Sequence, residues 1–169
     1  MSEDRQGLKP NAIAFIALCN EYCAAVEHAA ETGRDEFLAA MLRLLPRLYI
    51  SGADLAMPGF EGDYYIDDAL DEDYYDSMRR NMETLLGEDD TYLEVFEEDM
   101  KYSDTPIAVS AAETLADLFQ VFFNLLETVR DAPAELIESA LGAVREDFGN
   151  YWSQKLCNVL RALNQIRYK

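Results

Sequence analysis

Apolar residues recur at intervals of three and four positions through most of this chain, the spacing of a helix with one buried face. The first such stretch has Asn11 as its expected N-cap and Gly33 as its expected stop. Its apolar stripe consists of Phe15, Leu18, Cys19, Tyr22, Cys23 and Val26. From the length of the chain we expect one domain. Residues 1–10 are predicted to be a flexible N-terminus and residues 11–169 a single helical domain.

A second helix is predicted over the apolar stripe from Phe37 to Leu48. Pro46 lies inside it and lacks a backbone donor, so a kink or a break is expected at that position. Residues 52–62, with Pro and Gly at their centre, are typical of a loop.

The third and fourth helices have recognisable beginnings. The third is expected from about Asp71 to Leu86, because acidic residues in a first turn suit the positive end of the helix dipole. The fourth follows Ser110, which forms a capping box with Glu113 three residues later. Its polar residues, including Asp117, are expected to face water.

The last helix opens near Pro133 and keeps its apolar spacing almost to the end of the chain, with a bend expected near Gly149. Its single tryptophan, Trp152, lies on the apolar stripe and is expected in the core. Strand-like alternation is limited to a short segment from Tyr92 to Phe96. The pattern therefore predicts an all-α fold, a single-domain helical bundle of about five helices with an acidic, loop-rich middle segment.

The negative charge is concentrated in one part of the chain. The formal net charge is −19, and residues 54–104 alone hold 18 acidic and three basic residues. Since like charges repel, we expect no nucleic-acid binding and no attraction to anionic membranes. No stretch approaches the ~18 consecutive apolar residues that a membrane-spanning helix needs.

The acidic middle also holds six of the ten tyrosines, in two near-copies of one pattern. Carboxylates select a basic partner electrostatically, and aromatic rings hold ammonium or guanidinium groups. The residues predicted to bind such a partner are Asp63, Tyr64, Tyr65, Asp71, Asp73, Tyr74, Tyr75 and Asp76. The simpler alternative is a solvated acidic face with tyrosines packed against the core.

Residues suited to catalysis are sparse. His28 is the only histidine and is expected to cap a helix or lie on the surface, and the Glu-x-x-His pair of di-iron bundles is absent. A calcium loop starting at Asp71 fails, since Asp76 replaces the required glycine and Met82 the required glutamate. We predict no catalytic residue, metal ligand or cofactor. A carboxylate site for Mg²⁺ or Mn²⁺ built from several helices stays open.

The three cysteines, Cys19, Cys23 and Cys157, do not form a disulfide framework and are interpreted as buried, inert thiols. The N-terminus lacks the basic and then apolar order of a secretory signal. Both features favour a reducing, cytoplasmic location.

Five blocks along the chain consist mostly of packing residues. They are Phe15 to Glu27 with Tyr22-Cys23; Leu45-Pro46-Arg47-Leu48-Tyr49 followed by Leu55 and Pro58; Leu86-Gly87 with Asp90, Tyr92 and Val95-Phe96; Leu115-Ala116-Asp117-Leu118-Phe119-Gln120; and Phe148 with Trp152, Leu156 and Leu163. In this order they resemble the domain-of-unknown-function family 5063, a set of small bacterial proteins. The resemblance implies an all-helical fold and no assigned activity, so no catalytic residues carry over. Phe119 stands where the family pattern has a tyrosine.

These observations support two functional hypotheses. The first is a non-enzymatic interaction or regulatory protein whose acidic, tyrosine-rich surface binds a basic protein partner. The alternative is a small metal-dependent enzyme with carboxylate ligands, or a ligand-binding helical protein. A narrower variant, mimicry of nucleic-acid phosphates, requires carboxylates along an extended ridge. The long apolar last helix is also compatible with a homodimer.

Overall fold

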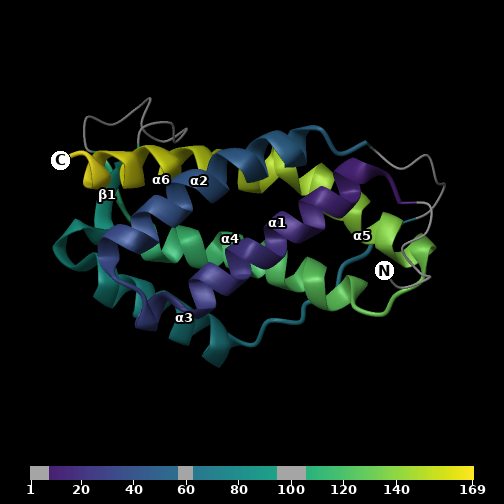
Figure 1. Ribbon diagram of the computed structural model, residues 1–169, viewed down its shortest axis with the longest axis horizontal. Helices are drawn as coiled ribbons and strands as arrows, with labels where there is room; N and C mark the ends of the chain where they lie inside the picture. The colour runs from purple at the N-terminus through teal and green to yellow at the C-terminus, as the bar shows by residue number, and fades with distance from the viewer. Residues whose placement is uncertain (1–7, 57–62, 95–105) are drawn as a thin grey trace.

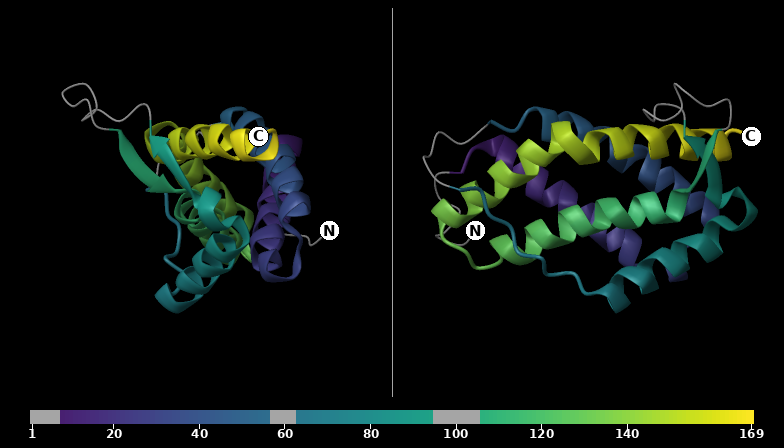
Figure 2. Two further views of the ribbon diagram at one scale, coloured as in Figure 1. Left: turned by 90° about the vertical axis from the view of Figure 1, so that its left-hand side faces the viewer. Right: turned by 180° about the vertical axis from the view of Figure 1, so that it is seen from behind.

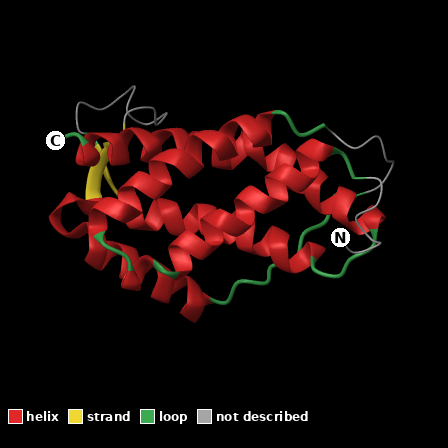
Figure 3. Cartoon of the chain, viewed as in Figure 1, coloured by secondary structure: helices red, strands yellow, loops and turns green. Residues whose placement is uncertain are grey.

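The computed structural model of the chain describes residues 8–56, 63–94 and 106–169. Its main helices are α1 (Pro10–Glu27), α2 (Arg34–Ala53), α3 (Glu72–Leu86), α4 (Ala111–Val129), α5 (Ala134–Asp147) and α6 (Ser153–Arg167). The shorter elements are the helical turns η2 (Ala29–Glu31), η3 (Gly87–Asp90) and η5 (Phe148–Trp152), and the strands β1 (Thr91–Glu94) and β2 (Ile107–Ser110). Because η5 joins α5 directly to α6, the described residues contain five long helical segments, and the predicted all-α bundle is confirmed (Figures 1 and 3).

Four of the helices form a closed ring around the core. α1 packs against α2 and α4, and α6 packs against the same two helices from the other side. α3 lies against α4 outside this ring, and α5 also packs on α4 (Figures 1 and 2). α4 is therefore the central element that touches most of the others.

Aromatic side chains fill the centre of the ring. Trp152 is fully buried, as expected, and its indole Nε1 donates to the carbonyl oxygen of Val144 at 2.9 Å. Its ring lies 5.2 Å from Phe122 of α4 and 6.1 Å from Phe15 of α1, measured between centroids. These aromatic contacts join η5, α4 and α1 at one point of the core, and they stabilise the packing beyond the burial of apolar area.

The predicted ends of the first helix are wrong. α1 begins at Pro10, whose ring fixes the backbone angle that a first helical residue needs. Asn11 is not the N-cap, because it lies inside the helix and its Nδ2 donates to the carbonyl of Asp54 at 2.9 Å. Gly33 does not end this helix, since it is the N-cap of α2.

Of the kink or break expected at Pro46, the break is absent. α2 continues through Pro46 to Ala53, because Leu45 and Leu48 on either side are fully buried and their packing holds the helix together. As a consequence Gly52 belongs to the helix and not to the loop predicted over residues 52–62. Residues 57–62 of that loop lie outside the described part of the chain.

α3 lies close to its predicted bounds, and Ser110 is the N-cap of α4 as predicted, whereas Asp71, expected in the first turn of α3, is the N-cap of that helix. Asp71 accepts a hydrogen bond from the backbone N–H of Tyr74 at 2.8 Å, and Gly87, with φ of +59°, ends the helix. Ser110 accepts from the backbone N–H of Glu113 at 3.1 Å. Both helix starts are therefore held by side-chain oxygens.

An antiparallel hairpin, only half anticipated, leads into α4. β1 falls in the one strand-like segment of the sequence, whereas no pattern predicts β2. Thr91 pairs with Ser110, and Glu94 with Ile107. The carboxylate of Asp90 accepts from the Ser110 hydroxyl at 2.6 Å and from the Ala112 N–H at 2.7 Å, which holds the hairpin to the start of α4.

The bend expected near Gly149 is a π turn, η5, between α5 and α6. A π turn contains one residue more than an α turn and is frequent at functional sites. Within the described ranges, no helix combines the length and apolar character needed to span a membrane.

Candidate functional site

Residues 63–70 form an extended segment, named the strap here, that runs along α5 and α4 to the start of α3 (Figure 2). Ser139 of α5 holds its beginning. The Ser139 hydroxyl accepts from the backbone N–H of Tyr65 at 3.0 Å and donates to the carbonyl of Asp63 at 3.2 Å. Tyr64, between them, turns inward, so close to Gly142 that a Cβ there would lie 2.5 Å from the tyrosine ring.

Two polar residues of α4 hold the rest of the strap. The Thr128 hydroxyl accepts from the backbone N–H of Asp67 at 2.9 Å. The Asn124 Oδ1 accepts from two successive N–H groups, those of Ala69 and Leu70, at 3.0 and 2.9 Å. The backbone of an irregular segment is thus satisfied by side chains, as secondary structure would do elsewhere.

The outer side of the strap takes no part in this anchoring and carries exposed carboxylates. We name as the acidic ridge the exposed acids of the strap and of the start of α3, namely Asp63, Asp67, Asp68, Asp71, Glu72 and Asp73. None of them forms an ion pair within the described residues. Tyr65 lies among them and is 54% exposed.

The basic residues of the C-terminal helix are engaged elsewhere. Lys155 Nζ lies 3.0 Å from Asp117 Oδ2, and Lys169 Nζ lies 2.8 Å from Asp89 Oδ1. Arg161 donates to the carbonyl of Leu93 in β1 at 2.8 Å. These contacts leave the acidic ridge without an internal cation among the residues that the structure describes.

The predicted partner-binding residues divide into two groups. Asp63, Tyr65, Asp71 and Asp73 belong to the ridge or lie exposed beside it, whereas Tyr64, Tyr74, Tyr75 and Asp76 are partly buried. Asp76 is 3.7 Å from Arg79.

Tyr74 and Tyr75 attach α3 to the bundle. The Tyr74 hydroxyl donates to Glu27 of α1 and its ring packs on Phe123, while the Tyr75 hydroxyl donates to Asp117 Oδ1 at 2.6 Å. Burial and the bond to Glu27 raise the pKa of Tyr74 to about 12, and burial with the bond to Asp117 raises the pKa of Tyr75 further. Both rings serve packing, as the simpler alternative expected for the tyrosines.

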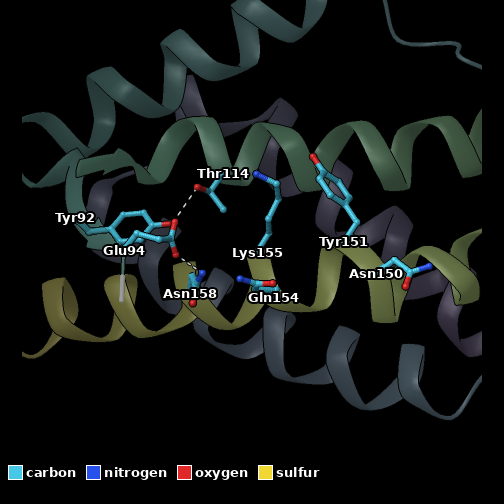
Figure 4. A pocket seen from close by; sticks show the side chains of 8 residues that line it. All are labelled: Tyr92, Glu94, Thr114, Asn150, Tyr151, Gln154, Lys155 and Asn158. Carbon is cyan, nitrogen blue, oxygen red and sulfur yellow. Dashed lines mark hydrogen bonds between the residues drawn. The ribbon is translucent and has the colours of Figure 1, made fainter. Parts of the chain in front are cut away.

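A second polar feature is a pocket of about 200 Å³ between β1, α4 and the η5–α6 segment (Figure 4). Its lining is Tyr92, Glu94, Thr114, Asn150, Tyr151, Gln154, Lys155 and Asn158. The floor is buried: Asn158 donates through Nδ2 to Glu94, and the hydroxyls of Tyr92 and Thr114 are 3.1 Å apart. Figure 4 shows β1 and α6 side chains meeting across the hollow, with Lys155 rising from α6 toward α4.

Asp117 links this pocket to α3, contrary to the expectation that it faces water. It accepts from Tyr75 with one oxygen and from Lys155 with the other. Burial lowers the pKa of Lys155, but the hydrogen bond and the charge of Asp117 outweigh it, so that the pKa is raised overall. The pocket therefore contains a fixed ammonium group.

None of the sequence patterns above predicts this pocket, although the spacing of three amide residues indicates it. Asn150, Gln154 and Asn158 recur every four residues, which places three amides on one helical face. Among the described residues, no group of three or more His, Cys, Asp and Glu side chains is arranged to hold a metal ion.

The thiols differ from the sequence interpretation in one case. Cys19 and Cys23 are buried, and burial raises the pKa of each well above its ordinary value, so both are poor nucleophiles. Cys157 is exposed, because it lies on the outer face of α6.

Together these features define a class of helical bundle, a ring of four helices with an outer helix and an acidic strap attached to it. The chain belongs to the family described as Domain of unknown function (DUF5063), whose model matches residues 6–169. It is similar to protein BF1032 from Bacteroides fragilis, a structural-genomics target. The crystal structure of that protein matches with a TM-score of 0.81 and 28% sequence identity, over 95% of this chain and 94% of that one. No curated protein matches the chain.

Proposed function

We propose that the protein is a non-enzymatic interaction protein whose acidic ridge binds the basic surface of a partner protein. One observation carries the proposal: six exposed carboxylates have no ion pair within the described residues. Three of them stand on the strap, whose backbone is held by Ser139, Thr128 and Asn124, and three at the start of α3. Repulsion among these carboxylates costs stability, and a cationic partner would relieve it.

The ridge has the properties of a selective docking surface. An extended strand rises about 3.3 Å per residue, so the strap spans on the order of 25 Å, comparable to one side of a protein interface. Since the strap backbone is already ordered, binding costs less conformational entropy than binding by a free loop. The exposed ring of Tyr65 is available for stacking on a guanidinium group.

The cytoplasm of a bacterial cell is the compartment that we propose for this binding. The free thiols of Cys19, Cys23 and Cys157 suit a reducing environment. A homodimer through the last helix stays a prediction, and light scattering of the purified protein measures it.

Two variants of equal charge test the ridge. The ridge variant carries Asp63→Asn, Asp67→Asn, Asp68→Asn and Asp73→Asn, which keep side-chain size and leave the cap at Asp71 intact. The control variant carries Glu31→Gln, Glu36→Gln, Glu88→Gln and Glu146→Gln at exposed positions outside the ridge. Each variant, and the unaltered protein, is immobilised and used to capture partners from a lysate of the native organism. The Kd of the captured protein is then measured.

The proposal expects a basic partner that the unaltered protein and the control variant retain at low salt. The ridge variant is expected to bind it at least tenfold more weakly. Binding should also weaken at 1 M salt, where the screening length falls to about 3 Å. Equal binding by the two variants would contradict the proposal. If added DNA or RNA displaces the partner, the ridge occupies a nucleic-acid-binding face, which is the phosphate-mimicry variant.

A further inference from the structure

The strand β1 pairs with β2 along one edge, and its other edge is open within the described residues. In an antiparallel pair, residues whose N–H and C=O bond across the ladder alternate with residues whose N–H and C=O point away from it. Ser110 lies opposite Thr91, but its carbonyl belongs to the first turn of α4, where it accepts from the Thr114 hydroxyl at 3.0 Å. Thr91 and, two residues later, Leu93 therefore direct their backbone groups to the open edge.

A contact from α6 agrees with this assignment and shows how much of the edge is free. Arg161 Nη2 donates to the carbonyl oxygen of Leu93 at 2.8 Å. The Leu93 N–H and both backbone groups of Thr91 form no hydrogen bond within residues 8–56, 63–94 and 106–169. An open edge of this kind is a template for pairing with a further strand, and proteins usually cover it.

A groove of about 440 Å³ lies directly against this edge. Residues Thr91 to Leu93 of β1 form one side of it, and the last turns of α6 form the other (Figures 1 and 2). The volume falls within the range of roughly 300–1,000 Å³ that ligand sites have. β1 has four residues, which at ~3.3 Å each give an edge of about 13 Å. The groove therefore has the length of a short extended segment.

The lining of the groove has an apolar floor and a polar rim. Its buried or partly buried members are Tyr92, Ala162 and Ile166, and its exposed members on α6 are Arg161, Gln165 and Lys169. Successive side chains of an extended segment point to opposite faces. Such a segment can therefore place an apolar side chain on the floor while its polar side chains remain at the rim.

The charges of the groove select an acidic segment. Arg161 has no acidic partner among the described residues, and Asp89 is shared by the two cations Arg34 and Lys169. From Phe148 to the last residue the sequence has four basic residues and no acidic one, in a chain of net charge −19. Hydrogen bonds between such cations and a carboxylate are roughly twice as strong as neutral ones. A second copy of the chain suits the groove less well, because it would join two chains of the same large negative charge.

We propose that the open edge of β1 and the last turns of α6 bind an extended, acidic segment of a partner protein, which adds to β1 as a third strand. The backbone of the segment bonds to Thr91 and Leu93, and its acidic side chains reach Arg161 and Lys169. In complexes of this kind the main-chain bonds give affinity and the side-chain contacts give specificity. The groove shares no residue with the acidic ridge, and binding to it does not depend on the ridge.

The test follows the backbone amide signals of the whole protein by NMR while blocked peptides are added at up to ~5 mM. Three peptides of about seven residues, each acetylated and amidated, alternate valine with glutamate, with serine or with lysine. We expect the glutamate peptide to shift the amide signals of Thr91 and Leu93 and to slow their hydrogen exchange several-fold. The serine peptide should bind more weakly, and the lysine peptide should not bind.

Two methylated forms of the glutamate peptide separate strand addition from simple charge attraction. One is N-methylated at its valines and the other at its glutamates, so that each lacks the N–H groups along one edge. Because only one edge of the peptide can pair with β1, one methylated form should bind at least tenfold more weakly than the other. Equal affinity of the two forms would overturn the proposal.

Two variants and a control locate the site. Leu93→Pro removes the N–H at the open edge, a position where a strand tolerates proline, and the side chain it replaces is 51% exposed. Arg161→Gln removes the unpaired cation, and the matched control Arg43→Gln removes another exposed arginine without an acidic partner among the described residues. Leu93→Pro should abolish binding of the glutamate peptide with Tm nearly unchanged. Arg161→Gln should raise its Kd at least threefold, and Arg43→Gln should not.

Binding of the glutamate peptide with shifts at Thr91 and Leu93 supports the proposal. Absence of a shift with all three peptides overturns it, as does equal binding of the lysine peptide. Slow exchange of the same two amides in a dimer of the free protein would also overturn it, because a second copy would then occupy the edge. None of these outcomes alters the capture experiment on the ridge.

Discussion

Gly52 is the position where the addition of one methyl group should have the clearest effect. A Cβ at this residue would lie 2.5 Å from Cη2 and 3.0 Å from Cζ2 of Trp152, and 3.2 Å from Cδ2 of Phe148. The indole cannot move away cheaply, since it is fully buried and bonded to the carbonyl of Val144. Gly52→Ala therefore forces overpacking at the centre of the helical ring.

Two opposing effects set the size of the change. Overpacking of a well-filled core costs about 1–3 kcal/mol. Replacing glycine by alanine in a helix returns up to about 1 kcal/mol. The overpacking term is larger, so Gly52→Ala should destabilise the protein by about 1–2 kcal/mol. In a chain of this size that corresponds to a fall in Tm of roughly 2–8 °C.

Urea denaturation followed by circular dichroism measures this change. Gly149→Ala is the matched control, because a Cβ there would meet nothing within 4 Å, and it should be neutral or stabilising. A double-mutant cycle with Trp152→Phe isolates the contact, since the smaller ring leaves room for the methyl group. In the Trp152→Phe background, Gly52→Ala should cost clearly less, since only the 3.2 Å approach to Phe148 Cδ2 remains.

Two results would refute the reasoning about this contact. One is a Gly52→Ala protein as stable as the Gly149→Ala protein. The other is an equal loss of stability with and without Trp152, which would place the cause outside the indole.

Three more changes probe the strap and its surroundings. Asn124→Leu removes the acceptor of two strap N–H groups and should cost about 1–3 kcal/mol with faster hydrogen exchange in the strap, while Asn124→Asp keeps the acceptor and the slow exchange. Gly142→Ala should shift the half-buried ring of Tyr64 and speed amide hydrogen exchange in the strap. It should lower the free energy of unfolding less than Gly52→Ala does, because the Tyr64 ring can move. Unchanged hydrogen exchange would contradict the contact between Gly142 and Tyr64. The pKa of Tyr74 is about 12 in the folded protein and about 10 in the unfolded chain. Its contribution to the free energy of unfolding is therefore complete below pH 10 and is lost as the pH rises toward 12. When urea denaturation is measured from pH 10 to 12, the free energy of unfolding should fall less steeply for Tyr74→Phe than for the unaltered protein.

Much of the bundle was accessible from the sequence because it depends on local patterns. The stripes of α1 and α4 consist of neighbours on one helical face, and the caps at Asp71 and Ser110 act within three residues. Of the two alternatives expected at Pro46, a break does not occur, because the local cost of proline is outweighed by the packing of α2 against other helices, which is not a local property.

The strap and the pocket escaped prediction because their contacts are distant in sequence. Asn124 lies 54 and 55 positions from the N–H groups it binds, and Ser139 lies 74 positions from Tyr65. The two strands have four residues each, too few for a clear alternation. The acidic region itself was predictable, since charge is counted directly, but which of its tyrosines remained exposed was not.

The π turn at Phe148–Trp152 sets the phase between the two halves of the long C-terminal helix. Each residue turns an α-helix by about 100°, so deleting Gly149 would restore a regular helix but rotate α5 and α6 against each other by that angle. Trp152 and the amide row of Asn150, Gln154 and Asn158 all follow Gly149, so they would turn together relative to the buried face of α5. One extra residue thus works as a phase adjustment, which lets one continuous helix keep Val144 of α5 buried while its second half presents an indole to the core and a row of amides to a pocket.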